Sequence, residues 1–302
     1  MEYLHKDKET FLQAINLVAN KNGIVPEIVE KDYYVTMILQ GLAKRMDYIV
    51  FKGGTSLSKC HKAIKRFSED IDITIDKTLS QGQKKSVKEN IVEIADEMGL
   101  EIPNLDDIRS RRDYNKYILT FDSVLDSKDE SAVPSQVLME TSYTTVSFPT
   151  VIMPVHNYIG DMMVEEAPSY IETYGLSPFE MKIQGIERTF IDKIFAICDY
   201  YIQGKTAKHS RHIYDIYKLF PKVESQNLKQ LYEDVRNVRK LSPICPSAAD
   251  GVDVKALLRE IISKEVYKSD YQLITEKILE EVVSYDTAIK TLERIVNSAW
   301  LL

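Results

Sequence analysis

Two glycines between residues 48 and 60 are the first feature that could do chemistry. Tyr48 to Phe51 is a β-branched and aromatic run typical of a strand, and Gly53 and Gly54 interrupt it. Glycines let backbone amides approach a bulky anion closely. Thr55 stands where a helix N-cap is expected, and apolar residues continue at helical spacing to Ile64. The pattern predicts a strand, a phosphate-binding turn and a helix that begins near Thr55.

A pair of acidic residues follows. Residues 70–75 alternate acidic or polar side chains with isoleucines, so Asp70 and Asp72 are expected on one face of a second strand. Two neighbouring carboxylates repel each other unless a cation lies between them. Hard oxygen ligands of this kind suit Mg²⁺, which also binds phosphate oxygens.

Together the two motifs predict a metal-dependent phosphate site built on one strand–helix–strand unit. Each motif alone has a simpler interpretation, in which Gly53-Gly54 is only a turn and the aspartates form a solvated strand face. Their order and proximity favour the functional interpretation.

The stretch FKGGTSLSK (51–59) followed by SEDIDI (68–73) resembles the signature of the DNA polymerase beta superfamily of nucleotidyltransferases, and specifically the AbiEii-type toxins that include the MenT enzymes. The resemblance implies that Asp70 and Asp72 bind Mg²⁺ or Mn²⁺ and are catalytic. It also implies transfer of a nucleoside monophosphate from an NTP to an acceptor hydroxyl. The implied nucleotide-binding residues near the turn are Gly53, Gly54, Thr55, Ser56 and Lys59.

A second set of charged residues lies on two later helices. Lys193 falls in a helix predicted over 187–203 and Asp215 in one over 210–220, joined by a short connection. Helices joined in this way pack side by side, so both side chains could face one cleft. The simpler alternative is a plain inter-helix salt bridge. ERTFIDKIFAI (187–197) and SRHIYDIYKL (210–219) resemble the family's two C-terminal motifs, which implies that Lys193 and Asp215 are catalytic and that Arg211 binds nucleotide.

Glu140 is a further candidate. It lies in a strand predicted over Gln136 to Tyr143, paired with another over Asn115 to Phe121, and would point away from Val137 and Met139. Resemblance to the superfamily implies a third carboxylate on such a strand, so Glu140 could be a metal ligand. An exposed strand glutamate is the alternative.

Composition predicts a globular cytoplasmic protein. The chain has 302 residues, 44% hydrophobic and 28% charged, with no run long enough to cross a membrane and no signal-peptide core. A net charge of −7 excludes a broadly cationic nucleic-acid-binding surface and leaves only local basic clusters. The predicted fold class is α+β, with a mixed or antiparallel nucleotidyltransferase sheet and flanking helices in the N-terminal half and a helical C-terminal half. The predicted domains are a nucleotidyltransferase core at 1–160 and a mainly helical domain at 161–302 that completes the active site.

The resemblance also implies an RNA acceptor, with tRNA 3′ ends as the expected substrate, a block of growth, and a cognate antitoxin encoded nearby. Two other interpretations stay open. The acceptor could be a small molecule or a protein side chain, or the chain could be an inactive nucleotide-binding module. Intact Asp70, Asp72 and Lys193 argue against the inactive module.

Overall fold

The computed structural model describes residues 2–66, 68, 70–125, 133–223 and 226–301. The chain forms two compact units, each built from three separate segments. The first unit comprises Met1–Phe51, Glu69–Tyr143 and Ile152–Ile183, and the second comprises Lys52–Ser68, Thr144–Val151 and Gln184–Leu302. A compact unit is not by itself an independently folding domain, so the division into 1–160 and 161–302 stays a prediction.

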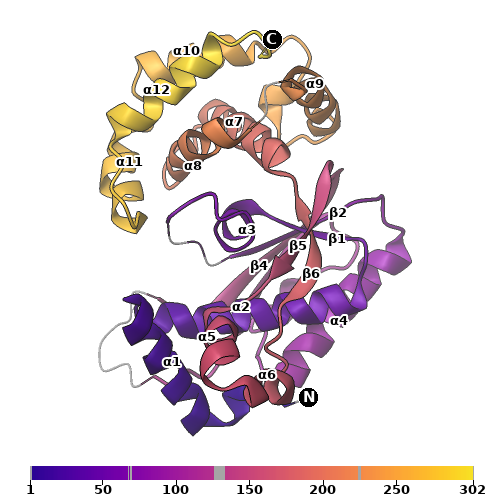
Figure 1. The fold of residues 1–302 in the computed structure, drawn as a ribbon. Coiled ribbons are helices and arrows are strands. Elements are labelled where there is room, and N and C mark those ends of the chain that lie inside the picture. Colours follow the sequence, from indigo (N-terminus) through magenta and orange to yellow (C-terminus); the bar gives the residue numbers. More distant parts are fainter. Residues whose placement is uncertain (1, 67, 69, 126–132, 224–225, 302) are drawn as a thin grey trace. The chain divides into compact units, whose positions relative to one another are not determined.

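One six-stranded sheet, in the order β3-β4-β2-β1-β6-β5, forms the centre of the first unit within the described residues (Figure 1). It is mixed, because β1 pairs with β6 in parallel and β3 with β4 antiparallel. The strands are β1 (Ile49–Lys52), β2 (Ile71–Ile75), β3 (Tyr114–Thr120), β4 (Gln136–Val146), β5 (Thr150–Val155) and β6 (Phe179–Gln184).

Helices flank this sheet. The long α2 packs against α1, α4 and α5. Local sequence explains where these helices begin: α2 has a proline at its start, and α4 has a capping box in which Ser80 and Gln83 bond each other's backbone amides. The helices and short 3₁₀ turns of this unit are η1 (Leu4–Lys6), α1 (Lys8–Asn22), α2 (Pro26–Arg45), α4 (Gln81–Met98), η2 (Leu105–Asp107), α5 (Tyr158–Glu166) and α6 (Pro168–Tyr174).

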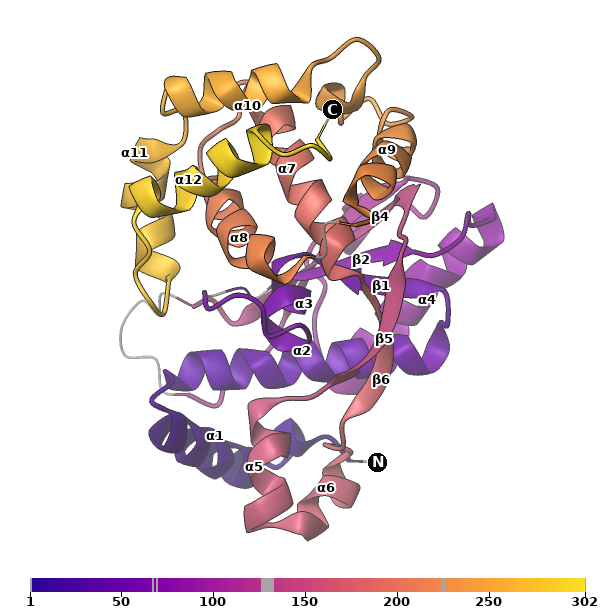
Figure 2. The ribbon, with the colours of Figure 1, turned by 45° about the horizontal axis from the view of Figure 1, so that its top comes forward.

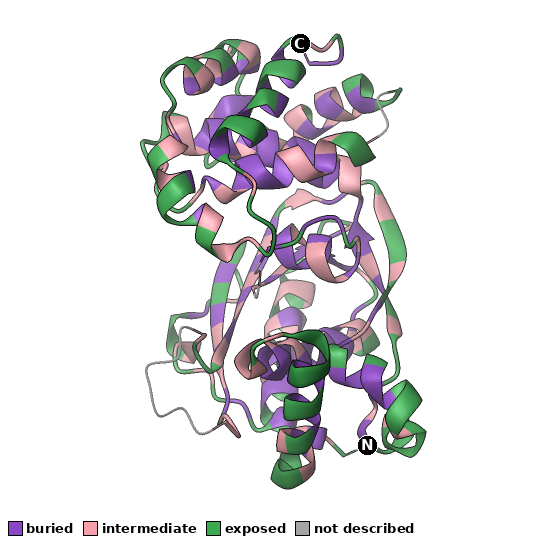
Figure 3. Ribbon diagram, turned by 60° about the vertical axis from the view of Figure 1, so that its left-hand side comes forward, coloured by how far each residue is buried: buried purple, intermediate pink, exposed green. Residues whose placement is uncertain are grey.

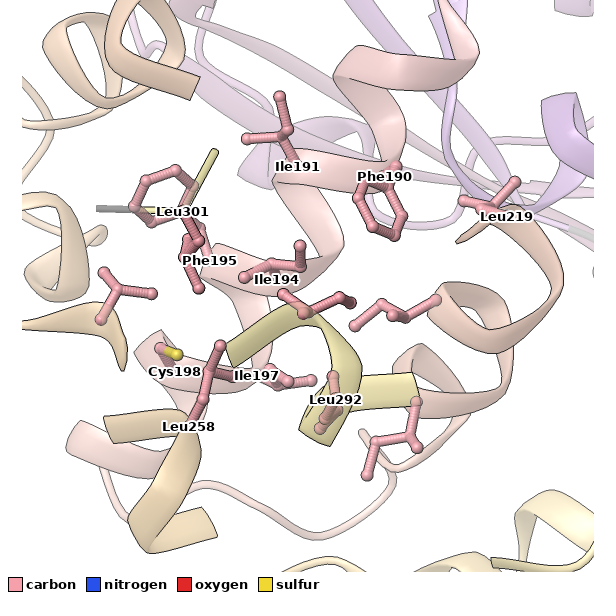
Figure 4. Close-up of a cluster of buried hydrophobic side chains, with 14 of the residues drawn as sticks. Phe190, Ile191, Ile194, Phe195, Ile197, Cys198, Leu219, Leu258, Leu292 and Leu301 are labelled. Carbon is pink, nitrogen blue, oxygen red and sulfur yellow. The ribbon is translucent and has the colours of Figure 1, made fainter. Parts of the chain in front are cut away.

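The second unit is helical and packs around α7 (Figure 2). Figure 3 shows buried residues concentrated on the inward faces of these helices, and Figure 4 shows apolar side chains of α7 packed with Leu258 of α10 and Leu292 of α12. The elements are α3 (Gly53–Lys59), α7 (Ile186–Ile202), α8 (Arg211–Leu219), η3 (Phe220–Lys222), α9 (Leu228–Arg239), η4 (Pro246–Ala248), α10 (Val254–Ser263), α11 (Lys268–Leu273), η5 (Thr275–Ile278) and α12 (Tyr285–Val296).

The helix after β1 differs from its prediction. It begins at Gly53, with Lys52 as N-cap, so the expectation of an N-cap at Thr55 was wrong. It also ends at Lys59 and does not continue to Ile64. The amides of Cys60 and His61 both bond to the Ser56 carbonyl, and Lys62 then adopts a left-handed conformation with φ of 47°, which a continuing helix excludes.

The predicted fold class is confirmed, since a mixed sheet with flanking helices precedes a helical C-terminal half. Residues 147–160 contain the edge strand β5 and the start of α5. No helix in the part of the chain that the structure describes is both long and apolar enough to cross a membrane.

Candidate active site

The glycine turn in the second unit is shaped by a buried arginine. Gly53 has φ of 80°, a backbone conformation that residues with a Cβ atom rarely adopt. A Cβ atom on Gly54 would lie only 2.6 Å from Ser68 Oγ and 2.7 Å from Arg66 Nη2. Both glycines are therefore required by the local structure, and the second leaves space for a guanidinium group.

The hydroxyl groups of this turn point into the protein. Thr55 Oγ1 lies 3.0 Å from Ser68 Oγ, and Ser56 Oγ donates to the Gly53 carbonyl at 3.0 Å. Ser56 is completely buried, whereas Lys59 at the end of α3 is half-buried. The hydroxyls thus stabilise the turn, and anion binding by Ser56 would require its present bond to be exchanged.

A carboxylate on α8 holds two cations from other parts of the second unit. Arg66 binds Asp215 in bidentate fashion, with Nε to Oδ1 at 2.7 Å and Nη2 to Oδ2 at 2.8 Å. Lys193 Nζ on α7 lies 3.2 Å from Asp215 Oδ2. Asp215 is fully buried and Lys193 is 9% exposed. The structure therefore brings Lys193 and Asp215 together as the sequence predicted, and adds Arg66 as a third member.

The position of Arg66 is fixed through its neighbouring backbone. The Lys65 amide donates to the Tyr214 hydroxyl at 3.2 Å, and that hydroxyl donates to the Lys65 carbonyl at 3.0 Å. Arg66 also forms an isolated antiparallel bridge with Leu279. These contacts hold the Arg66 side chain toward α8.

Electrostatics keep this carboxylate ionised. Burial alone raises the pKa of Asp215, but the positive charges of Arg66 and Lys193 outweigh it and hold the pKa well below the usual 3.8. The neighbouring His212 is instead kept uncharged, because burial and the positive charge of Lys193 hold its pKa well below 6.5. At neutral pH the group contains two cations, one carboxylate and an uncharged imidazole.

Arg211, a predicted nucleotide-binding residue, is the first residue of α8 and is partly exposed. Its charge contributes to lowering the pKa of both His209 and His212, after burial. Arg211 therefore belongs to the same charged neighbourhood as Lys193.

The two predicted metal ligands belong to the first unit. Asp72 lies in β2 between the buried Ile71 and Ile73, Asp70 immediately precedes that strand, and both aspartates are half-buried. Asp76, just past β2, donates its amide to the Tyr48 carbonyl just before β1. The two neighbouring strands are thus antiparallel, and the start of β2 lies at the carboxyl end of β1.

The donor set at β2 suits a hard cation. Among the described residues, no group of three or more histidine, cysteine or acidic side chains could hold a metal ion. Mg²⁺ commonly takes one or two protein carboxylates and completes its shell with water and substrate phosphates. Asp70 and Asp72 therefore fit a cation that is shared with a substrate.

Glu140 has a cross-strand partner. It lies directly opposite Lys116 in the β3–β4 ladder, with Lys116 Nζ 3.7 Å from Glu140 Oε1. Its side chain is 36% exposed, and it alternates with the buried Met139 and Thr141 as the sequence predicted. A strand pair of opposite charges accounts for this residue, and its role as a metal ligand stays a prediction.

Sequence analysis did not identify Arg66 as a site residue. Its position two residues before Ser68 carries no periodic signal, because the segment is neither helix nor strand. A second, partly buried network was also missed, in which Arg188 and Arg239 both bind Asp192. Their charges outweigh burial and lower the pKa of Asp192.

Substitution of Gly54 by alanine tests the space reserved for Arg66. The added methyl group would push the guanidinium away from Asp215, so we expect Gly54→Ala to lower the free energy of unfolding by about 1–3 kcal/mol. Gly82→Ala in α4 is the matched control, because its Cβ would meet only Ser80 Oγ at 3.9 Å. Urea unfolding measures both, and equal stability of Gly54→Ala and wild type would contradict the close packing.

Neutralising Asp215 tests the charge group. Asp215→Asn removes the buried negative charge that both Arg66 and Lys193 bind, and we expect a loss of about 3–5 kcal/mol in unfolding free energy. Glu89→Gln is the control, since it breaks an exposed pair with Lys85 (3.2 Å) and should cost less than about 1 kcal/mol.

The difference in unfolding free energy between wild type and Asp215→Asn should depend on pH in one direction. Because the folded-state pKa of Asp215 is depressed, its stabilisation is complete above the unfolded-state value of 3.8 and is lost as the pH falls further. The gap between wild type and Asp215→Asn should therefore be constant near neutral pH and narrow below 3.8. A gap that widens on acidification would contradict the assignment.

Comparisons with known proteins identify the family to which this sequence belongs. The sequence model of the nucleotidyl transferase AbiEii toxin family, assigned to type IV toxin–antitoxin systems, matches residues 38–294. No curated protein sequence matches the chain. MenT4, a nucleotidyltransferase toxin from Mycobacterium tuberculosis H37Rv, is 14% identical and has a TM-score of 0.51, over 95% of this chain and 89% of that chain. JHP933 from Helicobacter pylori is 17% identical over 89% of each chain, with a TM-score of 0.44.

The likeness to MenT4 is one of fold, whereas the family model spans most of the sequence, including the glycine turn, both aspartates, Lys193 and Asp215. The protein therefore belongs to the AbiEii family of nucleotidyltransferase toxins.

Proposed function

We propose that this nucleotidyltransferase is a metal-dependent toxin that transfers a nucleoside monophosphate from an NTP to the 3′ end of an RNA, with tRNA as the acceptor. The observation that carries the proposal is the buried Arg66–Asp215–Lys193 group. Asp215 holds both the Lys193 ammonium and the Arg66 guanidinium in fixed positions, and groups of this kind bind phosphate oxygens. Phosphoryl transfer depends chiefly on positioning and on such charge stabilisation.

The proposed reaction breaks one bond and forms one. The acceptor hydroxyl oxygen bonds to the α-phosphorus, the bond from that phosphorus to the bridging oxygen breaks, and pyrophosphate leaves while the hydroxyl proton is released. Asp70 and Asp72 would hold Mg²⁺ or Mn²⁺, and the bound ion would polarise the α-phosphate and lower the pKa of the attacking hydroxyl. Lys193 offsets the charge on the phosphates, and the Gly53-Gly54 amides contact them.

Asp215 acts as an orienting group for Lys193. The alternative is that Asp215 serves as a base for the acceptor hydroxyl. Its complete burial, its bonds to two cations and its depressed pKa all make it a poor proton acceptor. The carboxylate therefore fixes the lysine ammonium in place.

The family supports the biological part of the proposal. Type IV toxin–antitoxin membership supports a cognate antitoxin encoded nearby and growth arrest when the toxin acts alone. We propose that the protein acts in the cytoplasm, where NTPs and tRNA are present.

Transfer of labelled nucleotide tests the metal ligands. Each of four α-labelled NTPs is incubated with the protein and total RNA, and small RNA should become labelled. Asp70→Ala, Asp72→Ala and chelation of divalent ions should each reduce labelling by at least about a hundredfold, because the phosphate charge is then uncompensated. Label in a small molecule or protein, with RNA unlabelled, would contradict the RNA acceptor.

Glu140→Gln tests whether Glu140 is a metal ligand. RNA labelling should fall if Glu140 binds the metal and should be unchanged if it only pairs with Lys116.

Growth on expression tests Lys193. Lys193→Ala keeps the bidentate bond between Arg66 and Asp215, so the fold should persist while growth arrest disappears. Circular dichroism confirms folding, and Lys229→Ala on the exposed side of α9 provides a control for loss of one lysine. Growth arrest by folded Lys193→Ala would remove this lysine from the mechanism.

A further inference from the structure

Aromatic rings from the end of α7, the α7–α8 connection and the start of α8 stack on one another. The His209 and Tyr200 ring centroids lie 3.5 Å apart with planes only 8° from parallel. His212 is also nearly parallel to Tyr200, at 5.8 Å and 2°. His209 is only partly buried, so this stack reaches the surface of the second unit.

The stack is held rigidly by the backbone around it. Both carboxylate oxygens of Asp270 accept backbone amides, from Lys208 at 2.7 Å and from Ser210 at 3.1 Å. Ser210 Oγ lies 2.7 Å from Thr275 Oγ1, and Lys208 has a left-handed φ of 67°. These bonds fix the residues on either side of His209, so its ring is a preformed surface.

The same connection is basic. Lys205 and Lys208 are exposed and Arg211 is partly exposed, in a chain whose net charge is −7. Asp270 of α11 contacts this connection, but its carboxylate oxygens accept backbone amides. Burial lowers the pKa of the His209 imidazole, which favours the uncharged form of the ring.

The stack lies next to the proposed phosphate-binding lysine. His212 Nδ1 is 3.9 Å from Asp215 Oδ2, and the same oxygen is 3.2 Å from Lys193 Nζ. His212 is 8% exposed, and its Nδ1 has no hydrogen-bond partner within the described part of the chain. A continuous series of contacts thus leads from Lys193 through Asp215 and His212 to the stacked rings.

A preformed aromatic face flanked by lysines is how proteins bind single-stranded nucleic acid: bases stack on the ring and phosphates contact the cations. We propose that residues 203–211, together with Tyr200, bind the unpaired 3′ end of the acceptor RNA. A base of that end stacks on His209, and the adjoining phosphates lie against Lys205 and Lys208. This inference rests on the proposed RNA acceptor and adds the surface that holds it.

Equilibrium binding without NTP tests this surface separately from catalysis. The probe is a fluorescently labelled single-stranded RNA of twelve nucleotides ending in CCA, measured by anisotropy with the full chain. His209→Ala should weaken binding roughly 5-fold to 100-fold, and His209→Phe, which keeps a stacking ring, should restore most of it. Thermal unfolding of each variant shows whether the connection has stayed folded.

Lysine variants provide a second readout that does not depend on the ring. Lys205→Ala and Lys208→Ala should each weaken binding and reduce the slope of log affinity against log salt by about 0.7. Both side chains are exposed, so the variants should fold normally. Lys229→Ala makes the same charge change on α9 and should alter neither affinity nor slope.

The outcomes separate this inference from the proposed function. If wild type labels RNA while the His209 and lysine variants bind the oligonucleotide as wild type does, the inference is wrong and the function stands. If His209→Ala raises the KM for NTP and leaves RNA binding unchanged, the stack belongs to the NTP and the assignment to RNA is overturned. If wild type neither binds the oligonucleotide nor labels RNA, both proposals fail together.

Discussion

The structure of the second unit depends on one buried carboxylate. Asp215 has no solvent exposure, yet it stays charged because Arg66 donates hydrogen bonds to both of its carboxylate oxygens and Lys193 forms an ion pair with one of them. Removing charges from water costs several kcal/mol per ion, and a buried pair often stabilises a fold no better than well-packed apolar side chains. Stability alone therefore explains this group poorly. Its more direct effect is to hold a lysine ammonium in one place with a fixed charge.

The glycine turn packs against the charged group of Arg66, Asp215 and Lys193. Arg66 reaches Asp215 through the space that the missing Cβ of Gly54 provides, and Ser68 beside it bonds Thr55. The glycine turn is thus packed directly against the arginine that binds Asp215. In such an arrangement, binding energy and charge compensation come from neighbouring atoms that are already in position.

Local patterns in the sequence predicted most of the elements and part of the site. Helical periodicity placed Lys193 and Asp215 on consecutive helices, and the short connection between them was enough to predict that they meet. The partner of Asp215 from residue 66 was not predictable in this way, because a contact between distant segments leaves no period in either one. The end of α3 was missed for a related reason: apolar spacing continues to Ile64, while the left-handed Lys62 ends the helix.

The second unit is assembled from three stretches of the chain, and the cation that closes its buried charge group comes from the earliest of them. A gene fragment that begins at residue 184 would encode the helices α7 to α12 and would lack Arg66. Helices α7 to α12 therefore cannot be transferred alone without loss, because recombination at residue 184 would separate the buried Asp215 from Arg66. The glycine-turn segment and the C-terminal helices must therefore be present together for this ion pair to form.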